Sequence, residues 1–123
     1  MKILIVDDSS VLRDELRTHL EKGFDCIVSE AQDGKEGLAL AKSNQYDLII
    51  TDFNMPVMSG IDMAKQIRQM ENYNQIPIGM LTTESSPLMR ETGKQVGIDF
   101  WIVKPVEMKK FVSLLPKVFD IRK

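Results

Sequence analysis

The stretch ILIVDD at residues 3–8 decides the fold. Its four apolar residues follow one another without polar alternation, which is typical of a strand covered on both faces, as in a parallel sheet. Two aspartates end the run abruptly. Ser9 or Ser10 can then cap a helix whose apolar residues recur at helical spacing as far as Gly23. The opening of the chain therefore predicts a buried strand followed by a helix.

This alternation of an apolar run and a helical segment repeats four more times. The later apolar runs span residues 26–28, 48–50, 77–81 and 100–103. Each precedes a segment with apolar residues at helical spacing, and the connections are short, so we predict an α/β fold with five parallel strands and right-handed crossovers. Proline inside a helix removes a hydrogen bond, and Pro116 therefore predicts a kink or an early end of the last helix near Leu115.

Length and charge restrict the function. At 123 residues the chain is expected to form one domain, spanning residues 1–123. Its formal charge of −2 gives no attraction to nucleic acid or to an anionic membrane. The single Cys26 cannot form an intramolecular disulfide, and the chain has neither an 18-residue apolar run nor a leader-like start. We therefore expect a cytoplasmic protein that binds neither nucleic acid nor membrane.

Polar residues follow four of the predicted strands. Asp7 and Asp8 follow the first strand, Asp52 the third, Thr82 the fourth and Lys104 the fifth. Sites in open parallel α/β sheets lie outside the carboxyl ends of the strands, so these side chains should meet at one edge. Three carboxylates that meet repel one another unless a cation neutralises them, and a site of oxygen ligands suits Mg²⁺. The sequence predicts a magnesium site.

Magnesium in proteins commonly accompanies phosphate, which suggests phosphoryl chemistry. A carboxylate beside the ion can attack phosphorus, while an ammonium and a hydroxyl stabilise the oxygens of the transferring group. Asp52 fits the nucleophile, and Lys104 and Thr82 fit the stabilising roles.

These residues together resemble the receiver domain of response regulators, of the CheY-like chemotaxis type. The resemblance rests on Asp7-Asp8, on residues 52–56 with Gly60, on Thr82, and on Lys104-Pro105, in the order of that family. It spans nearly the whole chain. It implies a flavodoxin-like, doubly wound five-stranded sheet of order 2-1-3-4-5 with five helices.

The resemblance also implies a role for each matched position. Asp52 would accept the phosphoryl group from a histidine kinase, or slowly from a small acyl or amido phosphate. Asp8, Asp52 and the backbone carbonyl of Asn54 would coordinate Mg²⁺, with Asp7 helping through water. Lys104 would bind a phosphoryl oxygen.

Signal output is also implied by the resemblance. The Thr82 hydroxyl would move toward the bound phosphoryl group, and Trp101 stands where relatives usually carry Tyr or Phe as the switch aromatic. The surface of the fourth helix, fifth strand and fifth helix would then bind a protein target, such as a flagellar or chemotaxis component. We expect a monomer that catalyses only its own phosphorylation and dephosphorylation.

Other functions stay open. The chain could be the receiver domain of a longer response regulator. Phosphatases and mutases also use an aspartyl phosphate, but they usually place an Asp-x-Asp pair after their first strand, whereas Asp7 and Asp8 are adjacent. A receiver-like interaction module without phosphorylation would be expected to lose the Asp, Thr and Lys set, which is intact here. Trp101 could also be an ordinary core residue.

Overall fold

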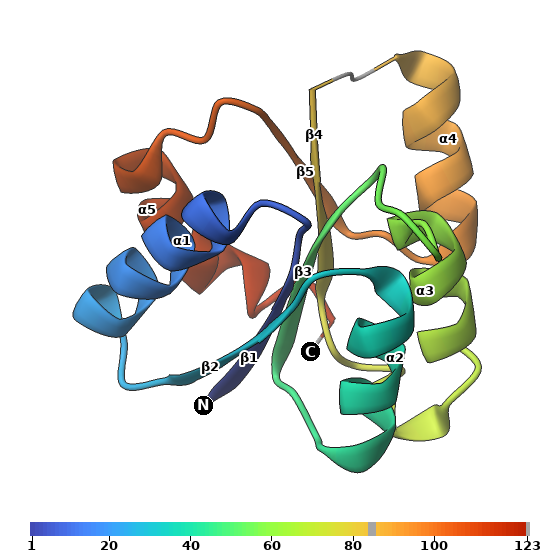
Figure 1. Ribbon diagram of the computed structural model, residues 1–123, viewed down its shortest axis with the longest axis horizontal. Coiled ribbons are helices and arrows are strands. Elements are labelled where there is room, and N and C mark those ends of the chain that lie inside the picture. Colours follow the sequence, from blue (N-terminus) through green and yellow to red (C-terminus); the bar gives the residue numbers. More distant parts are fainter. Residues whose placement is uncertain (84–85, 123) are drawn as a thin grey trace.

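The computed structural model describes residues 1–83 and 86–122 as five strands alternating with five α-helices. Figure 1 shows the sheet between two layers of helices, with α1 and α5 on one side and α2, α3 and α4 on the other. The elements are β1 (Lys2–Val6), α1 (Ser10–Gly23), β2 (Ile27–Ala31), α2 (Gly34–Ser43), β3 (Leu48–Asp52), α3 (Gly60–Ile67), the 3-10 turn η1 (Glu71–Tyr73), β4 (Ile78–Thr82), α4 (Pro87–Val96), β5 (Phe100–Val103) and α5 (Met108–Val118).

All neighbouring strands pair in parallel, in the order β2-β1-β3-β4-β5. This confirms the predicted fold class and strand order. The pairing aligns the strand ends, because Val6 pairs with Thr51, Asp52 with Leu81, and Thr82 with Val103. The residues that follow β1, β3, β4 and β5 therefore emerge at one edge of the sheet, which we call the carboxyl edge.

Short polar side chains begin four of the helices. Each accepts a hydrogen bond from a backbone N–H three residues later, which satisfies one of the amides that a helix start leaves unpaired. The four caps are Ser9, Asp33, Ser59 and Ser86. Ser9 is thus the cap of α1, and Ser10 is the first helical residue. Among the described residues, none of the helices combines the length and the apolar composition that a membrane span requires.

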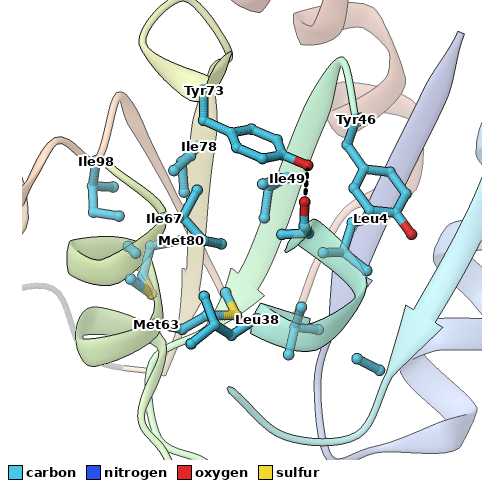
Figure 2. Packing of buried hydrophobic residues seen from close by; sticks show 14 residues of the cluster. Leu4, Leu38, Tyr46, Ile49, Met63, Ile67, Tyr73, Ile78, Met80 and Ile98 are labelled. Carbon is cyan, nitrogen blue, oxygen red and sulfur yellow. Dashed lines mark hydrogen bonds between the residues drawn. The ribbon is translucent and has the colours of Figure 1, made fainter. Parts of the chain in front are cut away.

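The core lies in two layers because successive strand residues point to opposite faces. On β1, Leu4 and Val6 face the layer under α2 and α3, whereas Ile3 and Ile5 face α1 and α5. Figure 2 shows the first layer, in which Tyr73 also donates a hydrogen bond to the backbone of α2. All four of these β1 residues are fully buried, as predicted for a strand covered on both sides.

Several predicted element boundaries differ in the structure, and two of these differences have a clear physical cause. The prediction that the last helix ends early near Leu115 is wrong, because α5 continues through Pro116 to Val118. Pro116 is exposed and lies in the last turn, where its missing N–H removes only one hydrogen bond near the helix end. The second strand begins at Ile27 rather than Cys26 and continues to Ala31. The apolar run did not include the polar residues of β2. This strand lies at the end of the sheet, where most of its side chains are partly exposed and need not be apolar.

Candidate functional site

Three carboxylates meet at the carboxyl edge, as the sequence predicts. Asp7, Asp8 and Asp52 each bring one carboxylate oxygen within 4.8 Å of the others. Asp7 is fully buried, Asp52 is 7% exposed, and Asp8 faces solvent. We call these three residues the acidic cluster. Its open side lies at Asp8, so an ion could enter there while the two buried carboxylates form the inner wall.

One lysine contacts two members of the acidic cluster. The Nζ atom of Lys104 lies 3.0 Å from Oδ2 of Asp7 and 3.2 Å from Oδ1 of Asp52. Its backbone N–H donates to the carbonyl of Thr82 at 2.8 Å, which extends the pairing of β4 and β5 by one residue and aims the side chain at the cluster. One ammonium against three carboxylates leaves two negative charges.

Backbone amides hold the buried carboxylates in place. Ser9 N–H donates to Oδ1 of Asp7, and Phe53 N–H donates to Oδ1 of Asp52, each at 2.8 Å. Sequence reasoning missed a further contact, because the guanidinium of Arg13 donates to the backbone carbonyl of Asp7. Arg13 lies on α1 and also pairs with Glu30 of β2 at 3.1 Å. Only the order of the strands reveals that these two side chains are neighbours.

Burial and charge make Asp52 harder to ionise than an ordinary aspartate. Loss of solvent raises the pKa of Asp52, and the nearby Asp7 charge raises it further, although Lys104 acts in the opposite direction. Burial alone would lower the pKa of Lys104, but its hydrogen bond to Asp7 and the charges of Asp7 and Asp52 raise that pKa overall. Lys104 therefore stays positively charged, but it does not offset the repulsion completely.

The donor set fits a hard divalent cation. The acidic cluster offers carboxylate oxygens at close spacing, a residual negative charge and one solvent-facing member. Mg²⁺ is typically bound by one or two protein carboxylates and several waters. It would relieve the repulsion from Asp7, which adds to the effect of burial in raising the pKa of Asp52.

The other predicted site residues occupy different surroundings. Thr82 is 3% exposed and ends β4, next to the strand that ends in Asp52. Asn54 is exposed in the loop two residues after Asp52. Trp101 is half-buried on β5, where it packs against the core layer under α3 and against Gly93 of α4. The structure thus brings the acidic cluster and Lys104 into direct contact and places Trp101 against α4.

The loop between β3 and α3 folds back on Asp52. Gly60 N–H donates to the carbonyl of Phe53 at 3.0 Å. A Cβ atom at Gly60 would lie 2.0 Å from the carbonyl oxygen of Asp52, so only glycine fits there. In the same loop Val57 has a positive φ of 71°, and Met58 N–H donates to the carbonyl of Pro56 at 2.8 Å. This is a tight γ-turn, which is an uncommon conformation for a β-branched residue.

Comparison with known proteins gives a consistent result. Residues 3–116 match the model of the response regulator receiver domain family. Chemotaxis protein CheY-3 of Vibrio cholerae is 38% identical over 121 residues, covering 98% of this chain and 92% of that protein. The structure of Vibrio cholerae CheY4 superimposes with a TM-score of 0.90 at 41% identity, covering 95% and 97% of the two chains.

A more distant structure concerns the metal. The receiver domain of the sensor histidine kinase PA1611 from Pseudomonas aeruginosa superimposes with a TM-score of 0.85 at 27% identity, covering 96% of each chain. It was solved with a magnesium ion in its active-site cleft. The match over most of the chain, the five-stranded sheet and the acidic cluster at its carboxyl edge agree, and the chain belongs to the response regulator receiver domain family.

Proposed function

We propose that Asp52 is the phosphoacceptor of this receiver domain and takes its phosphoryl group from a histidine kinase. One observation carries the assignment: Asp52 is the member of the acidic cluster that ends the central strand β3, and its Oδ1 lies 3.2 Å from Lys104. Asp7 is fully buried, whereas the solvent-facing Asp8 lacks a comparable enclosure. Asp52 is enclosed but, unlike Asp7, keeps a small exposed surface of 7%.

Each neighbour of Asp52 has a distinct part in the transfer. A carboxylate oxygen of Asp52 forms the bond to phosphorus as the bond from phosphorus to the donor's nitrogen breaks, and the donor histidine keeps that electron pair. Lys104 stabilises an oxygen of the transferring group. Asp7, Asp8, Asp52 and the carbonyl of Asn54 would hold Mg²⁺, which would neutralise charge between the carboxylates and the incoming phosphoryl oxygens.

The response to phosphorylation would pass through β4 and β5. Thr82 ends β4 beside Asp52, and its carbonyl accepts the hydrogen bond of Lys104. We propose that the Thr82 hydroxyl moves toward the phosphoryl group and that Trp101 changes its packing against α4. A protein target that prefers the altered surface of α4, β5 and α5 would then bind more tightly. The CheY relatives make a chemotaxis component the first target to test.

Receiver domains are signalling proteins, and we propose that this chain catalyses only its own modification and its reversal. The same atoms that position Asp52 for attack would position water for hydrolysis of the aspartyl phosphate. The acidic cluster lies at an open sheet edge, which suits docking of a kinase domain.

The assignment is tested by intact-mass analysis after incubation with acetyl phosphate and Mg²⁺. Wild-type protein should gain one phosphoryl group, and Asp52→Asn should gain none. Asp8→Ala should lose labelling together with Mg²⁺ binding. Asp62→Asn is the matched control, because Asp62 is an exposed carboxylate in the first turn of α3. It should label like the wild type.

Two results would count against the proposal. Unchanged labelling of Asp52→Asn would mean that another side chain is the acceptor. Full labelling of the wild type in excess EDTA would mean that the acidic cluster acts without a divalent cation.

A further inference from the structure

A second polar site lies at the opposite end of β5 from Lys104. It is a cavity of about 410 Å³ between α4, the start of β5 and the C-terminal segment. This volume falls in the range of small-molecule sites. The cavity is lined by Arg90, Lys94, Gly97, Ile98, Asp99, Trp101 and Arg122.

Two arginines share the Asp99 carboxylate, of which Arg122 lines the cavity and Arg68 does not. The Asp99 carboxylate accepts a hydrogen bond from Arg68 at 2.9 Å, and its two oxygens share the single Nε–H of Arg122 at 2.8 and 3.0 Å. The side chains of Arg68 and Asp99 are only 11% and 8% exposed. Two guanidinium groups therefore share one carboxylate, and one positive charge is left over. We call these three residues the arginine cluster.

Two more cations line the same cavity from α4. Arg90 and Lys94 are four residues apart, so they lie on one face of the helix, one turn from each other. Together with Arg122, the part of the cavity lining that the structure describes contains three cationic side chains and one carboxylate, that of Asp99. Trp101 completes the wall with an aromatic surface.

The formal charge is also unevenly distributed along the chain, with the positive excess in its C-terminal part. Residues 87–123 contain eight Lys and Arg against four Asp and Glu, a formal charge of +4. Residues 1–86 contain eight against fourteen, a formal charge of −6. The part of the chain that forms the cavity is thus the basic part of an acidic protein, and its field favours approach of an anion.

We propose that this cavity binds a small organic phosphate. Arg90, Lys94 and Arg122 would contact the phosphate oxygens, since guanidinium and ammonium groups form charge-assisted hydrogen bonds with such oxygens. Trp101 would pack against an apolar or aromatic part of the ligand. This site is separate from the acidic cluster, and the proposal does not depend on the role of Asp52.

Titration calorimetry with ADP, and separately with inorganic pyrophosphate, tests the proposal in a buffer containing EDTA. Removing Mg²⁺ prevents bridging of the phosphates to the acidic cluster. We expect saturable binding of ADP and a change in the emission of Trp101, the only tryptophan in the chain. Pyrophosphate should bind more weakly, because it lacks a group to pack against Trp101.

The deciding comparison uses two double variants that remove equal charge. Loss of two charge-assisted contacts in Arg90→Ala/Lys94→Ala should weaken ADP binding by at least about tenfold. Lys109→Ala/Lys110→Ala removes two exposed lysines of α5 outside this cavity and should leave the affinity within about twofold, because surface charges act weakly at a distance in salt. Asp52→Asn should bind ADP like the wild type.

Three results would overturn the proposal. They are the absence of saturable binding of ADP, equal weakening in the two double variants, and loss of binding in Asp52→Asn. Circular dichroism of each variant before titration establishes that it is folded, and Lys94→Gln gives a milder second test, in which ADP binding should also weaken.

Discussion

The two ends of the sheet carry clusters of charged side chains whose excess charge has opposite sign. At the carboxyl edge, the described residues place three carboxylates of the acidic cluster near one ammonium, that of Lys104. At the other end, the arginine cluster sets two guanidinium groups against the single carboxylate of Asp99. The first site has an excess of negative charge and the second an excess of positive charge.

The clusters also differ in how much of their polar surface the fold satisfies. Arg68 donates to the backbone carbonyls of Tyr73, Ile76 and Gly97 as well as to Asp99. Arg68 thus links the α3–β4 connection to the α4–β5 connection, and this inner part of the arginine cluster is structural. The acidic cluster has fewer donors than its carboxylates can accept, and one member faces solvent. The difference indicates that the inner pair of the arginine cluster, Arg68 and Asp99, stabilises the fold, whereas the acidic cluster is suited to bind an ion.

The largest effect should come from removing the centre of the arginine cluster. Asp99→Ala leaves Arg68 and Arg122 facing each other and removes the acceptor of the Ile78 N–H. Breaking a buried ion pair on one side typically costs about 3–5 kcal/mol of unfolding free energy, and we expect a loss near the lower end because Arg122 is partly exposed. Urea unfolding followed by circular dichroism measures it.

The control for this variant is an exposed carboxylate. Asp14→Ala breaks the surface pair with Arg17 and should cost about 0–1 kcal/mol, because the Asp14 side chain is 64% exposed. Similar losses in the two variants would contradict a structural role for the arginine cluster.

Two buried tyrosines extend the comparison to neutral groups. The Tyr73 hydroxyl lies 2.7 Å from the carbonyl of Ala41 and 2.6 Å from that of Asn44, whereas the buried Tyr46 hydroxyl has no hydrogen-bond partner within the described residues (Figure 2). Tyr73→Phe should therefore lose about 1–2 kcal/mol, and Tyr46→Phe should be neutral or slightly stabilising. Thermal unfolding of both variants measures the difference in stability. Equal losses of unfolding free energy would show that the hydrogen bonds of the tyrosine hydroxyl do not determine stability at these positions.

A smaller effect should come from the loop beside the acidic cluster. Val57 holds a positive φ of 71° with its side chain 76% exposed. Val57→Gly should relieve backbone strain of about 1–3 kcal/mol, partly offset by the greater chain entropy of glycine, for a net gain of about 1 kcal/mol. Val11→Gly, in the first turn of α1, should instead destabilise the protein. A loss of stability in Val57→Gly would mean that the turn is not strained.

The smallest effect should be the pH-dependent destabilisation that Asp52 causes. Its pKa is raised in the folded state, so the folded protein holds the carboxyl proton more tightly than the unfolded chain does. The resulting stabilisation is fully present below the ordinary carboxyl range and is lost as the pH rises through the raised pKa. Asp52→Asn cannot ionise. In EDTA it should be more stable than the wild type at neutral pH, and the difference should shrink as the pH falls toward 4. A difference independent of pH would contradict this account.

Local patterns predict the strands and the acidic cluster well. The apolar runs mark the buried central strands, and the parallel order then brings Asp7, Asp8, Asp52 and Lys104 to one edge without any knowledge of side-chain contacts. The apolar pattern locates the edge strand β2 less well, because the polar residues of β2 do not follow it. Pro116 does not end α5, because a proline near the end of a helix removes only one hydrogen bond and destabilises the helix little.

The arginine cluster could not be predicted in this way. Arg68 follows α3, Asp99 precedes β5 and Arg122 lies near the C-terminus, so no spacing in the sequence connects them. Each alone resembles an ordinary surface charge. Only the folded chain shows that they share hydrogen bonds. The positive φ of Val57 was likewise hidden, because a valine gives no local signal for that conformation.

The most direct test of the acidic cluster is to locate the phosphoryl group itself. Protein treated with acetyl phosphate and Mg²⁺ is reduced with borohydride, which converts an aspartyl phosphate to homoserine, and the peptides are mapped by mass spectrometry. We predict homoserine at Asp52 alone, and no conversion when EDTA replaces Mg²⁺. Conversion at Asp7 or Asp8 in place of Asp52, or conversion that persists in EDTA, would contradict it.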